Sequence, residues 1–374
     1  LFIADSWADD NDKTFSVTEV WSKDFKEMQG NPCRILQSSS GEIYVLVMQR
    51  GDWGGHDILV IKTDSKGEKL WERKLAGTDD NAKFDVCLSH KGGIVISWIQ
   101  FDHKGDPKYS HHFTEFNKDG KINDNETPLM LDNKSIIKSI KEKSFFLCNS
   151  ISALNNGGYL LSGQYMWSPN GDDIRPFCIG IAKIDDNFNF TWQQKYKLEG
   201  TALNVFQISS KEFLVSTYNK SNIWASKVMA SGEIKWKAKL CKTRSEDDGY
   251  WPKTYIDNQG NIYALGLVNN FAKADANGNI LWRTSKSSPP YLVTSMILSP
   301  DLTTIAGGFA EKKNNISSFL LNCDKEGKVI NEARYSPVYF AEIIPASEGG
   351  VIAALKKKSG WSLVKLDIYS KGNK

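Results

Sequence analysis

The sequence predicts an all-β protein in which one sheet-sized unit recurs seven times and the units close into a ring. Three observations predict this class: similar apolar segments recur along the chain, a turn motif recurs with them, and no convincing amphipathic helix of three turns is present. The 374 residues are 40% hydrophobic and 24% charged, a composition that excludes a disordered or fibrous chain.

The repeated segment is a short apolar run that follows a glycine-containing or polar turn. Its clearest copy, GEIYVLVMQ from Gly41, is followed by DILVIKTD, a tight turn and LWERKL. Similar segments begin at Gly92, Gly157, Lys211, Gly260, Thr303 and Gly349. Successive starts are 43 to 65 residues apart, a period typical of propellers. The sequence therefore predicts a seven-bladed β-propeller.

We expect a single propeller domain over residues 1–374. Its blades are predicted at approximately 32–76, 83–130, 145–198, 201–240, 250–286, 292–335 and 339–374. Runs such as Ile43 to Met48 are apolar without alternation, which indicates strands covered on both faces. Residues 131–143 are the best candidate for a helical or irregular insertion.

The turn between the last two strands of a unit reads Asp-x-x-Gly-x-x-x-Trp. Asp can close such a turn through its side chain and Gly accepts a positive φ, so the spacing has a mechanical cause. The complete copies are Asp64, Gly67, Trp71 and Asp275, Gly278, Trp282. Degraded copies are Asp185, Phe188, Trp192; Gly232, Trp236; Asp324, Gly327, Asn331; and Asn117, Gly120. We expect the tryptophans of this motif to lie in the core.

The two chain ends are predicted to share the last blade. The seventh unit stops near Lys374 before any Trp-bearing fourth strand, whereas VTEVWSKDF from Val17 to Phe25 matches LWERKL, with Trp21 in the position of Trp71. We therefore expect residues 14–25 to close the ring as the outer strand of that blade, which leaves no open sheet edge at the junction.

These units resemble the Asp-x-x-Gly-x-x-x-Trp β-propeller repeats of secreted bacterial proteins and, more distantly, the quinoprotein-like propellers. The resemblance covers nearly the whole chain and implies the propeller fold. It implies little about function, because that broad family includes scaffolds, adhesins, assembly factors and enzymes. The Asp-to-Gly spacing is shorter than is usual in quinoproteins, so we expect no quinone cofactor.

The charge, the cysteine spacing and the chain start limit the classes of partner and the cellular compartments that we expect. The formal net charge is +3 with both signs interspersed, so we expect no nucleic-acid partner, and no stretch is long and apolar enough for a transmembrane segment. The chain begins at Leu1, and we expect a secretory signal to have preceded it in a secreted, periplasmic or cell-surface protein. The six cysteines show no zinc-site spacing, and we expect free thiols ahead of disulfides: Cys33, Cys87, Cys148, Cys178, Cys241 and Cys323.

Motifs for catalysis are scarce. The sequence has no G-x-S-x-G, Walker, dinucleotide-binding or H-E-x-x-H motif, so we assign no catalytic residue, no metal ligand and no cofactor. His111 and Glu115 share one strand face and could form a metal corner, but packed side chains are the expected reading. Acidic loop clusters leave Ca²⁺ as a weaker option: Asp79 and Asp80, Asp172 and Asp173, and Glu246, Asp247 and Asp248.

Several aromatic and polar residues outside the repeat motif fall in predicted loops that meet at one mouth of the channel. They are Trp53, His56, His103, Tyr109, Trp167, Arg175, Tyr250 and Trp251. Aromatic surfaces beside polar groups suit a protein, peptide or carbohydrate partner, which predicts a non-catalytic binding or scaffold protein. Two alternatives stay open: the aromatics pin long loops to the blades, or loop carboxylates and His103 form the site of a glycan-acting hydrolase or lyase.

Overall fold

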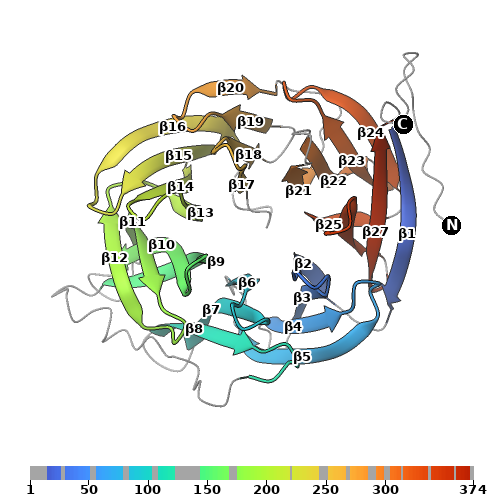
Figure 1. Ribbon diagram of the computed structural model, residues 1–374, viewed down its shortest axis with the longest axis horizontal. Coiled ribbons are helices and arrows are strands. Elements are labelled where there is room, and N and C mark those ends of the chain that lie inside the picture. The colour runs from blue at the N-terminus through green and yellow to red at the C-terminus, as the bar shows by residue number, and fades with distance from the viewer. Residues whose placement is uncertain are drawn as a thin grey trace.

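The computed structural model describes residues 15–26, 30–50, 56–78, 84–102, 108–122, 144–167, 175–219, 221–243, 252–266, 270–284, 292–298, 304–312, 315–335, 338–357 and 359–370. Seven antiparallel sheets are arranged as blades around a common centre, as Figure 1 shows. The predicted seven-bladed β-propeller is confirmed, and the described residues contain strands and turns but no helix.

The first three blades contain β2 to β12. The first blade is β2 (Asn31–Gln37), β3 (Ile43–Arg50), β4 (His56–Thr63) and β5 (Lys69–Thr78). The second is β6 (Phe84–Leu88), β7 (Ile94–Asp102) and β8 (Lys108–Phe116), and any fourth strand of this blade lies outside the described residues. The third is β9 (Ser144–Ala153), β10 (Tyr159–Trp167), β11 (Arg175–Ile184) and β12 (Phe190–Tyr196).

The remaining blades contain β13 to β27 and β1. The fourth is β13 (Thr201–Gln207), β14 (Glu212–Asn219), β15 (Asn222–Met229) and β16 (Ile234–Lys242). The fifth is β17 (Lys253–Ile256), β18 (Ile262–Gly266), β19 (Asn270–Ala274) and β20 (Ile280–Arg283). The sixth is β21 (Leu292–Leu298), β22 (Thr304–Lys312), β23 (Asn315–Cys323) and β24 (Val329–Tyr335). The seventh is β25 (Tyr339–Pro345), β26 (Val351–Lys356), β27 (Trp361–Ser370) and β1 (Phe15–Phe25).

Ring closure by the N-terminal strand is confirmed. The strand β1 pairs antiparallel with β27 from Phe15 opposite Ser370 to Phe25 opposite Trp361, with one bulge next to Trp21. In Figure 1 the dark blue β1 lies outside the red β27 as the outermost strand of the seventh blade. The Phe25 and Trp361 rings stack at 4.1 Å between centroids, which adds an aromatic contact to the ladder.

The core lies between the blades because the middle strands are covered on both faces. Ile43, Val45 and Val47 face one side of β3 and Tyr44 and Leu46 face the other, yet all five are fully buried. The odd set packs with the seventh blade and the even set packs with the second blade. The unbroken apolar run in the sequence therefore reflects contact with two neighbouring sheets.

The turn motif works as its spacing predicts. Asp64 Oδ1 accepts hydrogen bonds from the backbone N–H of Lys66 and of Glu68, each at 2.9 Å. Gly67 adopts φ +81° at the following corner, where a residue with a Cβ would be strained. A side chain there would also lie 2.8 Å from the ring of Trp21 in the neighbouring blade. This turn is therefore shaped by its own Asp and by a tryptophan of the neighbouring seventh blade.

The expectation that the motif tryptophans are core residues is wrong. Trp71 is only partly buried on the outer strand β5, where it leans on the turn of the next blade. Its Nε1–H donates to the Lys118 carbonyl at 3.0 Å, and a Cβ on Gly120 would come within 2.7 Å of the ring. Trp282 makes the same contact with the turn at Gly327. These tryptophans act as lock residues, which means that they join the outer edges of neighbouring blades. One edge of each indole ring therefore stays in contact with solvent.

The two irregular copies of the motif follow from this contact. The second blade shows no tryptophan in its described outer part, and the third blade carries Phe188 where the glycine is expected. Phe188 is 1% exposed, keeps φ +63°, and stacks against Phe113 of the second blade at 5.6 Å. The Phe188 ring therefore makes, from the third blade, the contact between blades that a tryptophan of the second blade would otherwise make. In the sixth blade Asn331 replaces tryptophan, and in the next blade the third strand β27 pairs with β1.

A lysine two residues before the turn ties the third strand to the second strand. Lys62 is buried, pairs with Glu42 at 2.7 Å and donates to the Lys118 carbonyl of the next blade at 2.9 Å. Burial opposes the charge of Lys62, but Glu42 outweighs it and raises the pKa of the lysine. In the second blade the pair is inverted: buried Glu115 stands in the lysine position and accepts from Lys91 at 2.9 Å. Opposite charges are kept although the residue types are exchanged.

Candidate functional site

The two rims of the ring differ in how their strands are connected. On the turn rim, which carries the connections between first and second strands and between third and fourth strands, every connection has four or five residues. On the opposite rim, here the mouth rim, the connections between second and third strands and between blades range from two residues (220–221) to ten (243–252). The segment 117–143 belongs to neither of these two sets of connections, because it begins with a turn on the turn rim. Length variation is thus concentrated at the mouth rim, where a repeat scaffold tolerates it.

The predicted site residues fall into two groups. Trp53, His103, Tyr250 and Trp251 lie outside the described residues. The backbone places the other four at the mouth ends of strands in three consecutive blades: His56 begins β4, Tyr109 is second in β8, and Trp167 ends β10 opposite Arg175 at the start of β11. The acidic loop clusters considered for Ca²⁺ also lie outside the described residues. The aromatic mouth therefore stays a prediction, with four of its backbone positions on one rim.

A second group of polar residues lies on the innermost strands of the blades and was missed by sequence reasoning. The register places one residue of each inner strand opposite the same position of the second strand, and each of these residues is polar or charged. This belt consists of Arg34, Asp85, Ser150, Asn204, Lys253, Ser295 and Glu342. An alignment of the first strands would have found it, because each unit carries this polar residue inside an otherwise apolar segment.

Belt side chains join several inner strands to the next inner strand around the ring. Four of the belt side chains form a hydrogen bond with the residue that follows the belt position in the next blade. Asp85 Oδ2 accepts from Ile151 N–H at 3.0 Å, and Glu342 Oε2 accepts from Ile35 N–H at 2.7 Å. Asn204 Oδ1 accepts from Thr254 Oγ1 at 3.2 Å, and Ser295 Oγ donates to the Ile343 carbonyl at 3.1 Å. The contacts satisfy polar groups that the ring would otherwise bury without partners. The belt therefore fixes the relative positions of the inner strands.

The four charged members of the belt form one connected cluster. Arg34 Nε lies 3.3 Å from Asp85 Oδ1, and its Nη1 lies 4.0 Å from Glu342 Oε1. Lys253 of the fifth blade passes the sixth blade and reaches the same Glu342 oxygen at 2.6 Å. Burial opposes the charge of Arg34, but Glu342 and Asp85 outweigh it and raise its pKa above the usual value. Two cations and two anions balance, so the cluster holds blades together without a net charge toward the channel.

Of the two residues weighed as a metal corner, Glu115 accepts hydrogen bonds from Ser89 and Lys91, and the side chain of His111 lies outside the described residues. The next residue, His112, stacks on Trp98 with 4.4 Å between ring centroids. Burial lowers the pKa of His112, which favours its neutral form. Within the described ranges, no group of three or more His, Cys, Asp or Glu side chains is placed to hold a metal ion. All six cysteines are free thiols, and burial raises the pKa of Cys148 to about 12.

The fold and the channel define a β-propeller, and the comparisons with known proteins agree on that class. No protein-family profile matches the chain, and no curated protein matches it in sequence. The Dos1 propeller aligns with a TM-score of 0.53 and 9% identity over 93% of this chain and 95% of its own. Raptor of Chaetomium thermophilum aligns with a TM-score of 0.60 and 12% identity over 95% of this chain but only 30% of its own.

A third structure, a protein of unknown function from Bacteroides caccae, aligns with a TM-score of 0.47 and 14% identity over 78% of this chain and 94% of its own. At these identities the likeness shows the fold alone. The resemblance to Asp-x-x-Gly-x-x-x-Trp repeats of secreted bacterial proteins stays a resemblance. Across the described part of the chain, no helix is long and apolar enough to cross a membrane.

Proposed function

We propose that this propeller is a non-catalytic recognition or scaffold protein whose mouth rim binds a protein, peptide or carbohydrate partner. The observation that carries the proposal is the contrast between the rims: outside the segment 117–143, the connections of the turn rim have four or five residues, against two to ten at the mouth rim. Binding residues are usually carried on loops of variable length that a rigid scaffold positions.

Contacts between the blades hold the ring together, as a scaffold for a binding surface requires. The belt links the inner strands, the tryptophans lock outer edges, and β1 closes the ring. A binding rim on this frame keeps its loops in fixed relative positions, which lowers the ordering cost of binding. The mouth-end positions of His56, Tyr109 and Trp167 on three consecutive blades support a surface that extends over several blades.

The experiment compares mouth tryptophans with a lock tryptophan. Purified full-length protein is screened on glycan and peptide arrays, and the strongest ligand is then titrated by calorimetry against Trp53→Ala, Trp251→Ala and Trp71→Ala. We expect the first two variants to weaken binding at least tenfold with a melting temperature within a degree of wild type. Trp71→Ala should lower the melting temperature and leave the ligand affinity unchanged.

Two results would contradict the proposal. Equal loss of stability and of binding in Trp53→Ala and Trp251→Ala would return both residues to a packing role. A ligand whose affinity is insensitive to both substitutions would place the binding surface elsewhere on the ring.

A further inference from the structure

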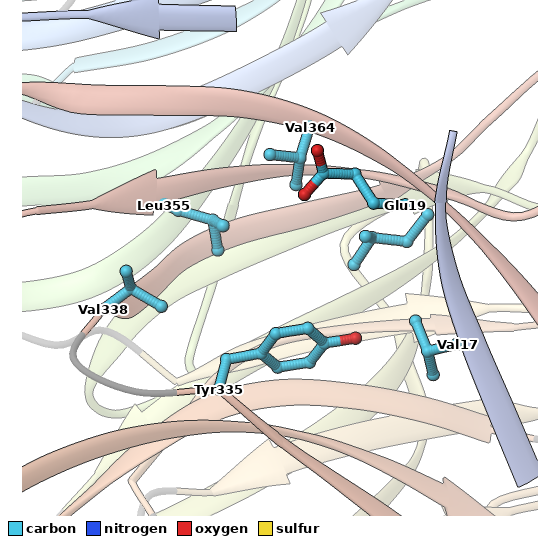
Figure 2. A pocket seen from close by; sticks show the side chains of 7 residues that line it. Val17, Glu19, Tyr335, Val338, Leu355 and Val364 are labelled. Carbon is cyan, nitrogen blue, oxygen red and sulfur yellow. The ribbon is translucent and has the colours of Figure 1, made fainter. Parts of the chain in front are cut away.

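The outer wall of the ring offers a stronger candidate for a further site than the cavity at the seventh blade. That cavity lies between β24 of the sixth blade and β26, β27 and β1 of the seventh blade, where Val17, Glu19 and Tyr335 border it (Figure 2). It has room for about one water molecule. On the outer wall, by contrast, the fourth blade carries positive charges that its own strand does not balance.

These charges lie on β16, the last strand of its sheet and the outermost strand of the fourth blade in Figure 1. Its sequence, IKWKAKLCK, contains four lysines and no acidic residue. The four lysines are exposed: Lys235, Lys237, Lys239 and Lys242. Arg283 of the fifth blade adds a fifth cation, because its Nε and Nη2 donate to the carbonyls of Leu240 and Lys239, each at 2.6 Å.

The corresponding positions of the other outer strands mix their charges. One and three residues after the motif tryptophan, the first blade has Glu72 and Lys74, and the seventh blade has Ser22 and Asp24. The third blade has Gln193 and Lys195, and the sixth blade has Glu332 and Arg334 after Asn331. Among the described outer strands, only β16 has cations at both positions, Lys237 and Lys239. The repeat therefore does not require these lysines.

Carboxylates of the same blade do not balance Lys237 and Lys239. Glu233 pairs with Lys235 at 2.9 Å, and Glu212 pairs with Lys227 of β15 at 3.3 Å. Across the residues that the structure describes, no carboxylate pairs with Lys237, Lys239 or Lys242. Lysines on an edge strand hinder pairing with a second copy of the chain, but the same charges attract an acidic segment.

The lysines share one face of the sheet and keep a regular spacing. Lys237 lies opposite Ser226 of β15, Lys239 opposite Trp224 and Lys242 opposite Asn222, and residues opposite each other in a ladder point to the same face. Lys237 Nζ lies 4.6 Å from the centroid of the Trp224 ring, which holds this ammonium in place. Lys237 and Lys239 are two residues apart, about 6.8 Å along the strand.

This spacing indicates which anion fits. An extended peptide with Asp or Glu at every second residue repeats its carboxylates at the same distance of about 6.8 Å, so that one register pairs Lys237 and Lys239 together. Arg283 occupies the carbonyls of Lys239 and Leu240, so recognition rests on the lysine side chains more than on a backbone ladder. Single-stranded nucleic acids need open aromatic faces for their bases, but Lys237 lies over the indole of Trp224.

We propose that the lysine face of β16, formed by Lys237, Lys239 and Lys242 beside Trp224, binds an extended acidic segment of a protein partner. Carboxylates at alternate positions of that segment pair with successive lysines. The lysine face lies on the outer wall of the ring, and the proposal does not rest on the function proposed for the mouth rim.

The first test compares two peptides of identical composition and charge. In Ac-(Glu-Thr)₄-NH₂ the glutamates alternate, whereas in Ac-(Glu-Glu-Thr-Thr)₂-NH₂ no two glutamates are two residues apart. Each peptide carries a fluorophore and is titrated with the full chain by fluorescence anisotropy at low ionic strength. We expect the alternating peptide to bind at least fivefold more tightly and to lose affinity as salt screens the exposed charges. Equal affinities would overturn the proposal, because net charge alone would then explain binding.

The second test sets the alternating peptide against other polyanions. Oligothymidylate and oligogalacturonate with the same number of charges compete with the labelled peptide. We expect both to displace it at least fivefold less effectively than the unlabelled peptide does. Equal or stronger displacement by either competitor would assign the lysine face to a nucleic acid or to an acidic polysaccharide and would overturn the assignment to a protein segment.

Matched variants separate the lysine face from the net charge of the protein. Lys239→Glu should weaken binding of the alternating peptide at least tenfold and leave the melting temperature unchanged. Arg334→Glu makes the same change of charge at the corresponding position of the sixth blade, and it should alter the affinity less than twofold. Lys237→Arg keeps a cation over Trp224 and should retain binding, whereas Lys237→Gln should weaken it. Equal losses in Lys239→Glu and Arg334→Glu would overturn the proposal.

Discussion

Restoring the repeat motif in the third blade should destabilise the protein. Phe188→Gly gives this turn the residue that the other turns use, and by the motif alone it would be neutral or favourable. In the structure, however, Phe188 is 1% exposed and stacks between Phe113 and Tyr159, at 5.6 and 5.7 Å between ring centroids. The phenyl ring fills the space that a neighbouring tryptophan fills elsewhere, so its removal leaves a cavity.

The magnitude follows from two opposed effects. Truncating a fully buried phenylalanine costs about 3–5 kcal/mol. Releasing a non-glycine residue from the left-handed region, here φ +63°, returns about 1–2 kcal/mol. We therefore expect Phe188→Gly to lower the free energy of unfolding by about 1–4 kcal/mol. Phe188→Ala loses the ring but keeps the backbone strain. We expect its free energy of unfolding to lie about 1–2 kcal/mol below that of Phe188→Gly.

Urea denaturation followed by tryptophan fluorescence measures both variants against wild type. The order of stability, wild type above Phe188→Gly above Phe188→Ala, is the expected result. A Phe188→Gly protein as stable as wild type or more stable would refute the reasoning, because backbone strain would then outweigh the packing of the ring between blades. Equal stability of the two variants would show that the positive φ is relaxed when the ring is removed.

Three further perturbations test the ion pair, the closure and its pH dependence. Lys62→Glu places a second carboxylate beside Glu42, and we expect it to lower the free energy of unfolding by about 2–4 kcal/mol, with at least half recovered when Glu42→Lys is added. Deleting residues 1–25 removes β1 and should give oligomers in size-exclusion chromatography; a truncated chain that stays monomeric with unchanged melting would contradict the closure. Hydrogen bonding to Lys357 lowers the pKa of Asp24, so this contact stabilises the fold above about pH 4 and is lost as the pH falls through the folded pKa. Asp24→Asn should therefore flatten the acid side of the melting-temperature profile, and an unchanged profile would assign the acid response to other carboxylates.

Strands and turns were predictable because their causes are local. An Asp that accepts from the N–H groups two and four residues later, and a Gly at the corner, shape the turn at Asp64 wherever it occurs. Strands covered on both faces leave an unbroken apolar run such as Ile43 to Val47. Closure was also predictable, since the chain start carries the one unit strand that the chain end lacks.

The aromatic mouth stays a prediction. The alternation of strand direction placed the loop residues on one rim, and the backbone at His56, Trp167 and Arg175 follows that rule. The belt was not predicted, because one polar residue in an inner strand carries no sign of the partner it meets. Lys253 shows this most clearly: its partner Glu342 is two blades away around the ring.

By itself, the sequence determined the number of blades, the strands, the turns and the strand that closes the ring, since each depends on short-range patterns repeated at a fixed period. The tertiary structure alone decided what lies between the blades. It places Trp71 on an outer edge and Phe188 in a gap between two blades, and it leaves the Tyr335 hydroxyl without a hydrogen-bond partner. These outcomes depend on residues about one blade apart in the chain, and no local pattern records which of them will meet.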